Sequence, residues 1–127
     1  MVNNAGIALE GSVGLLRIHE TASSTFDTTL RINGRSIFLG CKYAIAQMLK
    51  QDPLPPNARG DAERGWIVNM ASMLGLVGFK GVPSYCASKG VVVQLTRQVA
   101  LDYAKDKIHV NALCPGCELF MWSLSSF

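Results

Sequence analysis

Trp66-Ile67-Val68-Asn69-Met70 is the stretch that decides the fold, because it is short, β-branched and bounded by glycine and polar residues. Such a run is typical of a strand that is covered on both faces of a parallel sheet. Ile108-His109-Val110-Asn111-Ala112-Leu113 is a second run of the same kind. A third is only a stub, Val2 followed by Asn3-Asn4-Ala5-Gly6. The sequence therefore predicts three short buried strands.

Two longer helical patterns separate these strands, one from Phe26 to Leu49 and one from Ser84 to Ala104. Their apolar positions are Leu30, Ile37, Tyr43, Ala44 and Met48 in the first, and Val92, Leu95, Val99 and Tyr103 in the second. Residues 51–65 are rich in proline and glycine, which predicts a surface loop. The order strand, helix, strand, helix, strand predicts an α/β fold built on a parallel sheet.

The composition excludes several classes of protein. Apolar residues make up 49% of the 127 residues and charged residues 17%, which is typical of a folded domain and not of a disordered chain. The most apolar stretch, Ser36 to Leu49, is interrupted by Lys42 and Gln47 and does not predict a membrane span. The N-terminus lacks the features of a signal peptide. The net charge of +3 comes from scattered cations, so we expect no nucleic-acid partner, no membrane association and a cytoplasmic location.

Tyr85 and Lys89 form the most informative pair of side chains. A separation of four residues inside a helical pattern places both on one helix face. A phenol has a pKa of about 10, and a nearby ammonium favours its deprotonated form. Such a pair can move a proton to or from the oxygen of an alcohol or ketone. Taken alone, the same spacing also occurs in ordinary exposed helices.

Ser72 follows the 66–70 strand, where the carboxyl end of a parallel strand opens toward a ligand crevice. The loop that follows can return to Tyr85, so a hydroxyl at Ser72 can hold a substrate carbonyl while Tyr85 supplies the proton. Without Tyr85 and Lys89, Ser72 is interpreted as a turn residue at a strand end.

Four segments together resemble successive motifs of the short-chain dehydrogenase/reductases, in family order and near family spacing over residues 2–116. They are Asn3-Asn4-Ala5-Gly6, Ser72, Tyr85-Cys86-Ala87-Ser88-Lys89 and Val110-Asn111-Ala112-Leu113-Cys114-Pro115-Gly116. The resemblance implies part of a Rossmann-like doubly wound parallel sheet, roughly its fourth to sixth strands with two long crossover helices. It also implies an oxidoreductase that transfers hydride between NAD or NADP and a small-molecule alcohol or ketone.

The resemblance further implies the role of each matching residue. Tyr85 is then the general acid/base, and Lys89 assists it and binds the nicotinamide ribose. Ser72 orients the substrate oxygen, and Asn33 completes the proton relay by holding a water. Asn3, Ala5 and Gly6 border the adenosine part of the cofactor, while Pro115 and Gly116 close its nicotinamide side. No residue is expected to bind a metal.

The sequence also departs from the family pattern. The family begins with a strand and a glycine-rich turn around the cofactor pyrophosphate, and the resemblance here begins only at the fourth strand. We therefore expect a partial cofactor-binding domain over residues 1–116 and a divergent tail over residues 117–127. The preference between NAD and NADP is not predicted, and the activity of the chain by itself stays open.

Two other functions remain as alternatives. The family's two long helices commonly form a subunit interface, so the chain can be a non-catalytic fragment that acts through Phe26–Leu49 and Ser84–Ala104, or a homo-oligomer. Cys114-Pro115-Gly116-Cys117 is a C-x-x-C pattern that can mark a thiol-redox module.

Overall fold

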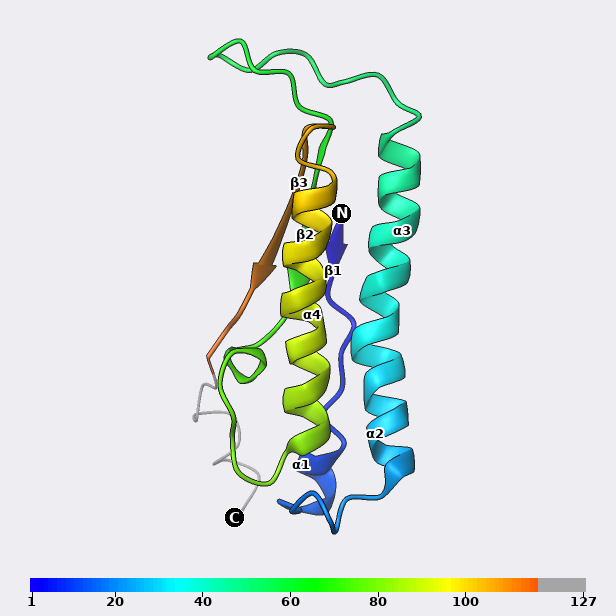
Figure 1. Cartoon of the computed structure of the whole chain (residues 1–127), viewed down its shortest axis with the longest axis vertical. Coiled ribbons are helices and arrows are strands. Elements are labelled where there is room, and N and C mark those ends of the chain that lie inside the picture. Colours follow the sequence, from blue (N-terminus) through cyan, green and yellow to red (C-terminus); the bar gives the residue numbers. More distant parts are fainter. Residues whose placement is uncertain (117–127) are drawn as a thin grey trace.

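A parallel three-stranded sheet organises the computed structural model, which describes residues 1–116 (Figure 1). The strands are β1 (Val2–Asn3), β2 (Gly65–Met70) and β3 (Ile108–Leu113), and their order in the sheet is β1-β2-β3. Val2 lies opposite Val68, and Ile67 lies opposite Val110. The predicted α/β class and the three predicted strands are confirmed, but the strands are buried mainly on one face of the sheet and not on both.

One long helical rod connects β1 to β2. It consists of α2 (Ser23–Leu30), a π-helical turn η1 (Arg31–Arg35) and α3 (Ser36–Met48). The helix expected over Phe26–Leu49 is therefore confirmed, but the π turn inside it was not predicted. Two short helices, α1 (Glu10–Val13) and η2 (Met73–Gly75), lie in the loops.

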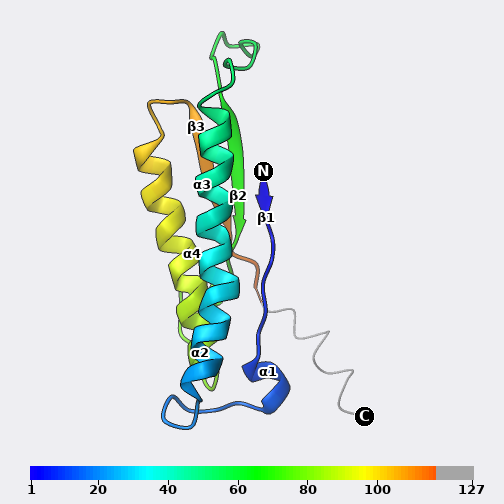
Figure 2. The same ribbon diagram turned by 90° about the vertical axis from the view of Figure 1, so that its right-hand side faces the viewer.

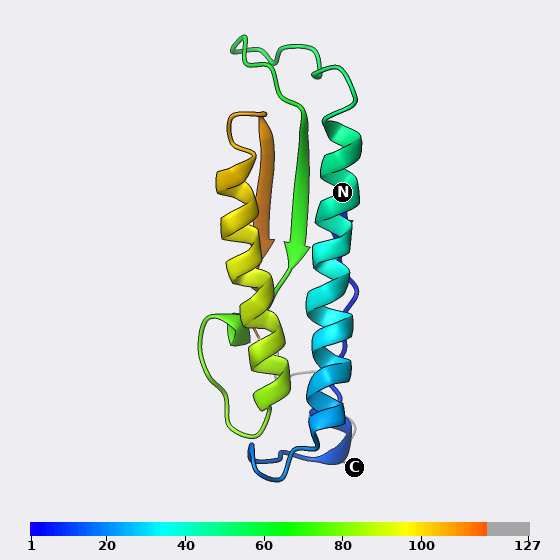
Figure 3. The ribbon, with the colours of Figure 1, turned by 45° about the vertical axis from the view of Figure 1, so that its right-hand side comes forward.

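The second crossover helix, α4 (Pro83–Asp102), connects β2 to β3. Figures 2 and 3 show that α4 and the α2–α3 rod lie side by side on the same face of the sheet. The loop between α3 and β2 extends beyond the sheet and is exposed over most of its length, as predicted.

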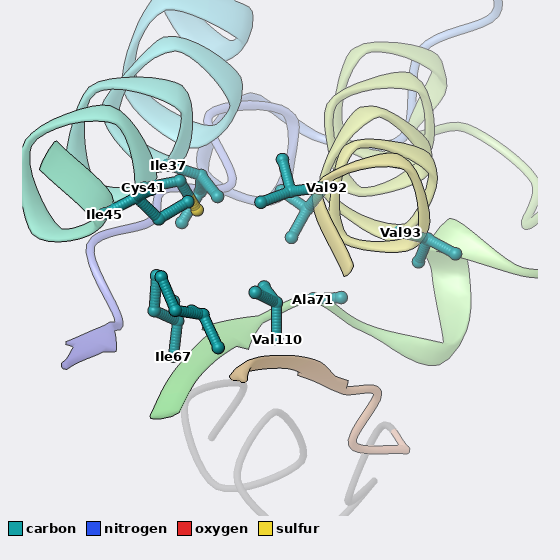
Figure 4. Packing of buried hydrophobic residues seen from close by; sticks show 10 residues of the cluster. Ile37, Cys41, Ile45, Ile67, Ala71, Val92, Val93 and Val110 are labelled. Atoms are coloured by element: carbon teal, nitrogen blue, oxygen red, sulfur yellow. The ribbon is translucent and has the colours of Figure 1, made fainter. Parts of the chain in front are cut away.

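The hydrophobic core fills the space between the two helical rods and the sheet (Figure 4). Its buried members are Ile37, Cys41, Ile45, Ile67, Ala71, Val92, Val93, Val99, Ile108 and Val110. Tyr43, one of the apolar positions of the predicted helix, is 65% exposed and does not belong to this core. The buried stripe of α3 recurs every fourth residue at Ile37, Cys41 and Ile45, and a residue two positions from Cys41 lies on the opposite side of a helix.

The other face of the sheet carries exposed side chains. Val2 is 62% exposed and Leu113 is 52% exposed. Trp66 stacks on His109 with the ring centroids 6.0 Å apart. Within residues 1–116, no helix covers this face (Figure 2).

The tail over residues 117–127, which we expected to be a divergent segment, lies outside the described residues. Among the helices of residues 1–116, none has the length and apolar character needed to cross a membrane. The same part of the chain contains no cluster of three metal-ligating side chains.

Candidate active site

A groove of about 360 Å³ lies at the carboxyl ends of the three strands. Its walls come from the segment after β1, the segment after β2, the first turns of α4 and the segment after β3. The lining residues are Asn4, Gly6, Ile7, Ala8, Met70, Ala71, Ser72, Tyr85, Lys89, Pro115 and Gly116. Six of the residues singled out from the sequence, Gly6, Ser72, Tyr85, Lys89, Pro115 and Gly116, therefore line one space.

Ser72 is placed by the end of β2. The residue has extended backbone angles, and its Oγ accepts a hydrogen bond from the backbone N–H of Leu74 at 3.2 Å. Ser72 thus caps the N-terminus of η2. The side chain is buried against the protein but still lines the groove. The hydroxyl hydrogen is not used in this bond, so it can be donated to a ligand oxygen.

Tyr85 and Lys89 share one face of the first turns of α4. The Lys89 Nζ lies 5.7 Å from the centre of the Tyr85 ring and donates a hydrogen bond to the carbonyl oxygen of Met70 at 2.8 Å. Lys89 is only 5% exposed. Burial lowers the pKa of its ammonium, and the smaller electrostatic effect of Cys114 opposes this lowering.

Asn33 lies in the π turn and is completely buried. Its Oδ1 accepts the N–H of Ile7 at 2.8 Å, and its Nδ2 donates to the Ile7 carbonyl at 2.9 Å and to Ser88 Oγ at 2.9 Å. The Ser88 hydroxyl donates in turn to the Tyr85 carbonyl at 2.8 Å. Asn33 thus holds Ile7, which lines the groove, and connects it through Ser88 to α4, the helix that carries Tyr85.

Asn3 and Ala5, in contrast, do not line the groove. The Asn3 side chain is buried and donates to Asn69 Oδ1 at 2.8 Å, and Asn69 donates to Thr96 Oγ1 at 2.9 Å. A Cβ on Gly40 would lie 2.2 Å from Asn3 Oδ1, so only glycine allows α3 to pack this closely on β1. Ala5 is exposed. This network holds β1 in place at the edge of the site.

The groove has the chemistry and the space to accept a nicotinamide ribose. Its lining offers an ammonium and two hydroxyls, which are hydrogen-bond donors suited to ribose and carbonyl oxygens. A Cβ on Gly6 would lie 3.4 Å from Lys89 Nζ and 3.6 Å from Asn33 Oδ1. The glycine therefore leaves open a space in front of Lys89 that any other side chain would fill.

Two residues of the site were missed from the sequence. Glu10 is completely buried, and its carboxylate accepts hydrogen bonds from the backbone N–H groups of Ser84 and Tyr85. Ser88 joins Asn33 to Tyr85 as described above. The sequence did indicate that the first turn of α4 needs a capping acceptor from elsewhere in the chain, because α4 begins with a proline and no Ser, Thr, Asp or Asn stands immediately before it.

The thiols show no paired arrangement in the part of the chain that the structure describes. Cys41, Cys86 and Cys114 are free, and Cys117 lies outside that part. Burial raises the pKa of the Cys41 thiol, and a weaker hydrogen bond with Asn69 opposes this effect.

Comparison with known proteins identifies the family. Residues 1–119 match the family model described as short chain dehydrogenase. The sequence is 44% identical over 116 residues to 2-(R)-hydroxypropyl-CoM dehydrogenase of Xanthobacter autotrophicus, covering 91% of this chain and 41% of that protein. It is 42% identical over 116 residues to a protein of the same organism named inactive 2-(S)-hydroxypropyl-CoM dehydrogenase 2, covering 91% of this chain and 44% of that protein. The chain thus spans about two fifths of the length of these relatives.

A solved structure titled ElxO with NADP bound superposes on this chain with a TM-score of 0.78 and 31% sequence identity. The match covers 98% of this chain and 46% of that one. The family match, the parallel sheet and the structural similarity agree, and the chain belongs to the short chain dehydrogenase family of NAD(P)-dependent oxidoreductases.

Proposed function

We propose that residues 1–116 form the proton-transfer and nicotinamide-binding part of an oxidoreductase site that acts on a small alcohol or ketone with NAD or NADP. The observation that carries this proposal is the single groove lined by Ser72, Tyr85 and Lys89. When bound, the nicotinamide supplies the hydride chemistry.

In this proposal Tyr85 moves the proton. The phenol donates its proton to the carbonyl oxygen in reduction and accepts the alcohol proton in oxidation. Lys89 supports the phenolate with its charge, because its Nζ lies near the ring in a buried setting where charge interactions are strong. Ser72 donates a hydrogen bond to the substrate oxygen and orients it toward Tyr85.

The remaining residues hold the site together and bind the cofactor. Asn33 keeps Ile7 against the groove and is proposed to complete the proton relay. Gly6, Pro115 and Gly116 border the nicotinamide end, where the backbone N–H of Met73 donates to the Pro115 carbonyl at 2.9 Å. Asn3 and Ala5 are proposed to border the cofactor further along the strand end.

Titration of the purified chain with NADH, NADPH and reduced nicotinamide mononucleotide tests this site. Since the groove offers its donors to the nicotinamide ribose, we expect nicotinamide fluorescence to saturate with all three, with affinities within about tenfold of one another. Gly6→Val fills the space in front of Lys89 and should weaken binding by about tenfold or more.

Gly78→Val is the matched control, because a Cβ at Gly78 meets no atom within 4 Å. It should bind like the wild-type chain. If none of the three nucleotides saturates the wild-type chain, or if both glycine variants bind equally well, the proposed nicotinamide site is wrong.

A second function, self-association through the helices, is favoured by an apolar groove of about 520 Å³ between the α2–α3 rod and α4. Phe38 and Val91 line it and are 50% and 41% exposed. Exposed apolar surface of this kind is typical of a site that meets another protein. A homo-oligomer formed on these two helices is therefore the alternative proposal.

Sedimentation at several concentrations tests the self-association. We expect the wild-type chain to associate, and Phe38→Asp to weaken the association by at least about tenfold, because it places a charge in a desolvated interface. Tyr43→Asp, at an exposed position that does not line this groove, is the control. A monomer at every concentration would contradict this proposal.

A further inference from the structure

A carboxylate from the N-terminal segment caps the helix that carries Tyr85. Glu10 is the first residue of α1 and has no exposed surface. Its Oε1 accepts the N–H of Ser84 at 2.7 Å, and its Oε2 accepts the N–H of Tyr85 at 3.0 Å. Both oxygens of one buried carboxylate are thus bound to consecutive amides in the first turn of α4. Burying a carboxylate costs free energy unless hydrogen bonds replace its lost hydration, and the two amides of α4 supply such bonds here.

The local sequence of α4 explains why it needs an external cap. The first amides of a helix lack partners within the helix. Val82 before the helix makes no side-chain capping bond, and Pro83 has no N–H to satisfy. The N–H of Cys86 already donates to the Val82 carbonyl at 3.0 Å. Ser84 and Tyr85 therefore present the amides that require an acceptor, and an anion at a helix N-terminus is also favoured by the helix dipole.

The same carboxylate joins the groove wall to the tyrosine helix. Glu10 follows Ile7 and Ala8, which line the groove, and Asn33 holds Ile7 through both of its backbone groups. Further along this segment, the N–H of Leu16 donates to the Gly81 carbonyl at 3.1 Å. Figure 1 shows α1 beside the first turn of α4. The segment after β1 is thus anchored at one end to the π turn and at the other to α4.

We propose that Glu10 is a positioning residue for Tyr85: by binding the Tyr85 and Ser84 amides, it holds the first turn of α4 in the register that aims the phenol into the groove. The inference rests on the proposed role of Tyr85 as the proton donor. Glu10 itself touches neither substrate nor cofactor in this proposal. It acts only through the backbone of the residue that does.

Glu10→Gln separates positioning from general stability. Glutamine keeps one acceptor oxygen and replaces the other with an NH₂ group, which cannot accept an amide hydrogen bond. We expect amide hydrogen exchange at Ser84 or Tyr85 to accelerate about tenfold, while the amides of Val92 and Val93 later in α4 are unchanged. The three-bond couplings to Cγ should show that Tyr85 loses its single side-chain rotamer.

In the turnover assay, the same variant should lose about tenfold in kcat while KM changes less than about twofold, because only the tyrosine is displaced. Glu10→Asp keeps both oxygens and should retain more of kcat than Glu10→Gln. Glu20→Gln is the control, since Glu20 accepts the N–H of Arg17 at 2.7 Å on an exposed turn. It should change neither the Tyr85 rotamer nor kcat.

The outcomes distinguish this inference from the proposed function. Faster exchange in Glu10→Gln with an unchanged Tyr85 rotamer would show a cap that does not position the phenol, and would overturn the inference. If the wild-type protein shows no turnover, the proposed function fails, and the exchange and rotamer measurements still decide the inference. If Glu10→Gln does not fold, the wild-type chain is measured instead: couplings across the hydrogen bonds from Ser84 and Tyr85 to the Glu10 carboxyl carbon, together with a single Tyr85 rotamer, support the inference, and the absence of either overturns it.

Discussion

Tyr85→Phe should lower turnover by about a hundredfold to ten-thousandfold, the range that a positioned general acid or base contributes. The variant removes only the hydroxyl, so the ring keeps its packing in the first turn of α4 and its place near Lys89. KM should change little, because the proposed loss is in proton transfer and not in binding. Steady-state alcohol oxidation with NAD and NADP measures the effect.

Tyr43→Phe is a matched control for this experiment. Tyr43 also lies near an ammonium, with Lys42 Nζ 5.8 Å from its ring centre, but the side chain is 65% exposed and does not line the groove. Removing its hydroxyl should leave turnover unchanged. Equal turnover in wild type and Tyr85→Phe would contradict the role assigned to Tyr85, whatever the effect of Tyr43→Phe.

The predictable part of the fold depends on local sequence. The strands around Ile67 and Val110 were predicted because β-branched runs bounded by glycine or polar residues carry their own signal. The π turn at Asn33 was not predicted, because the Asn33 side chain at its centre is held by hydrogen bonds to Ile7 and Ser88, which are distant in sequence. Tyr43 illustrates a related limit: it is one of the apolar positions of the predicted helix, but the apolar pattern alone did not show which positions of α3 face the sheet.

The candidate site likewise contains residues that local sequence predicts and residues that only tertiary contacts reveal. Ser72, Tyr85 and Lys89 were found because their spacing places two of them on one helix face and one at a strand end, and they do line one groove. Their catalytic roles stay predictions. Glu10 was missed because its carboxylate binds amides that lie 74 and 75 positions further along the chain. The residues that carry the chemistry could be predicted from motifs, whereas the residues that hold them in place depend on tertiary contacts.

Lys89→Met should lower turnover by about a hundredfold or more and should also change how stability depends on pH. The turnover falls because the phenolate of Tyr85 loses a buried cation beside it. Lysines ordinarily have a pKa of about 10.4, and burial lowers the pKa of Lys89, against a smaller opposing effect of Cys114. At a pH between the lowered pKa and the ordinary one, Lys89 therefore carries a proton in the unfolded chain that it has released in the folded chain.

This difference in bound protons determines the sign of the pH effect. Where the unfolded state binds more protons, the free energy of unfolding rises with pH. The wild-type chain should therefore gain stability as the pH rises through the lowered pKa toward about 10.4, and Lys89→Met should lack this part of the gain. Denaturant unfolding across that range measures it, with Lys42→Met, which removes an exposed ammonium, as the control. Stability curves that run parallel for wild type and Lys89→Met would mean that the Lys89 ammonium is as well solvated as that of an exposed lysine. The buried ammonium that donates to the Met70 carbonyl would then not be the form that supports Tyr85.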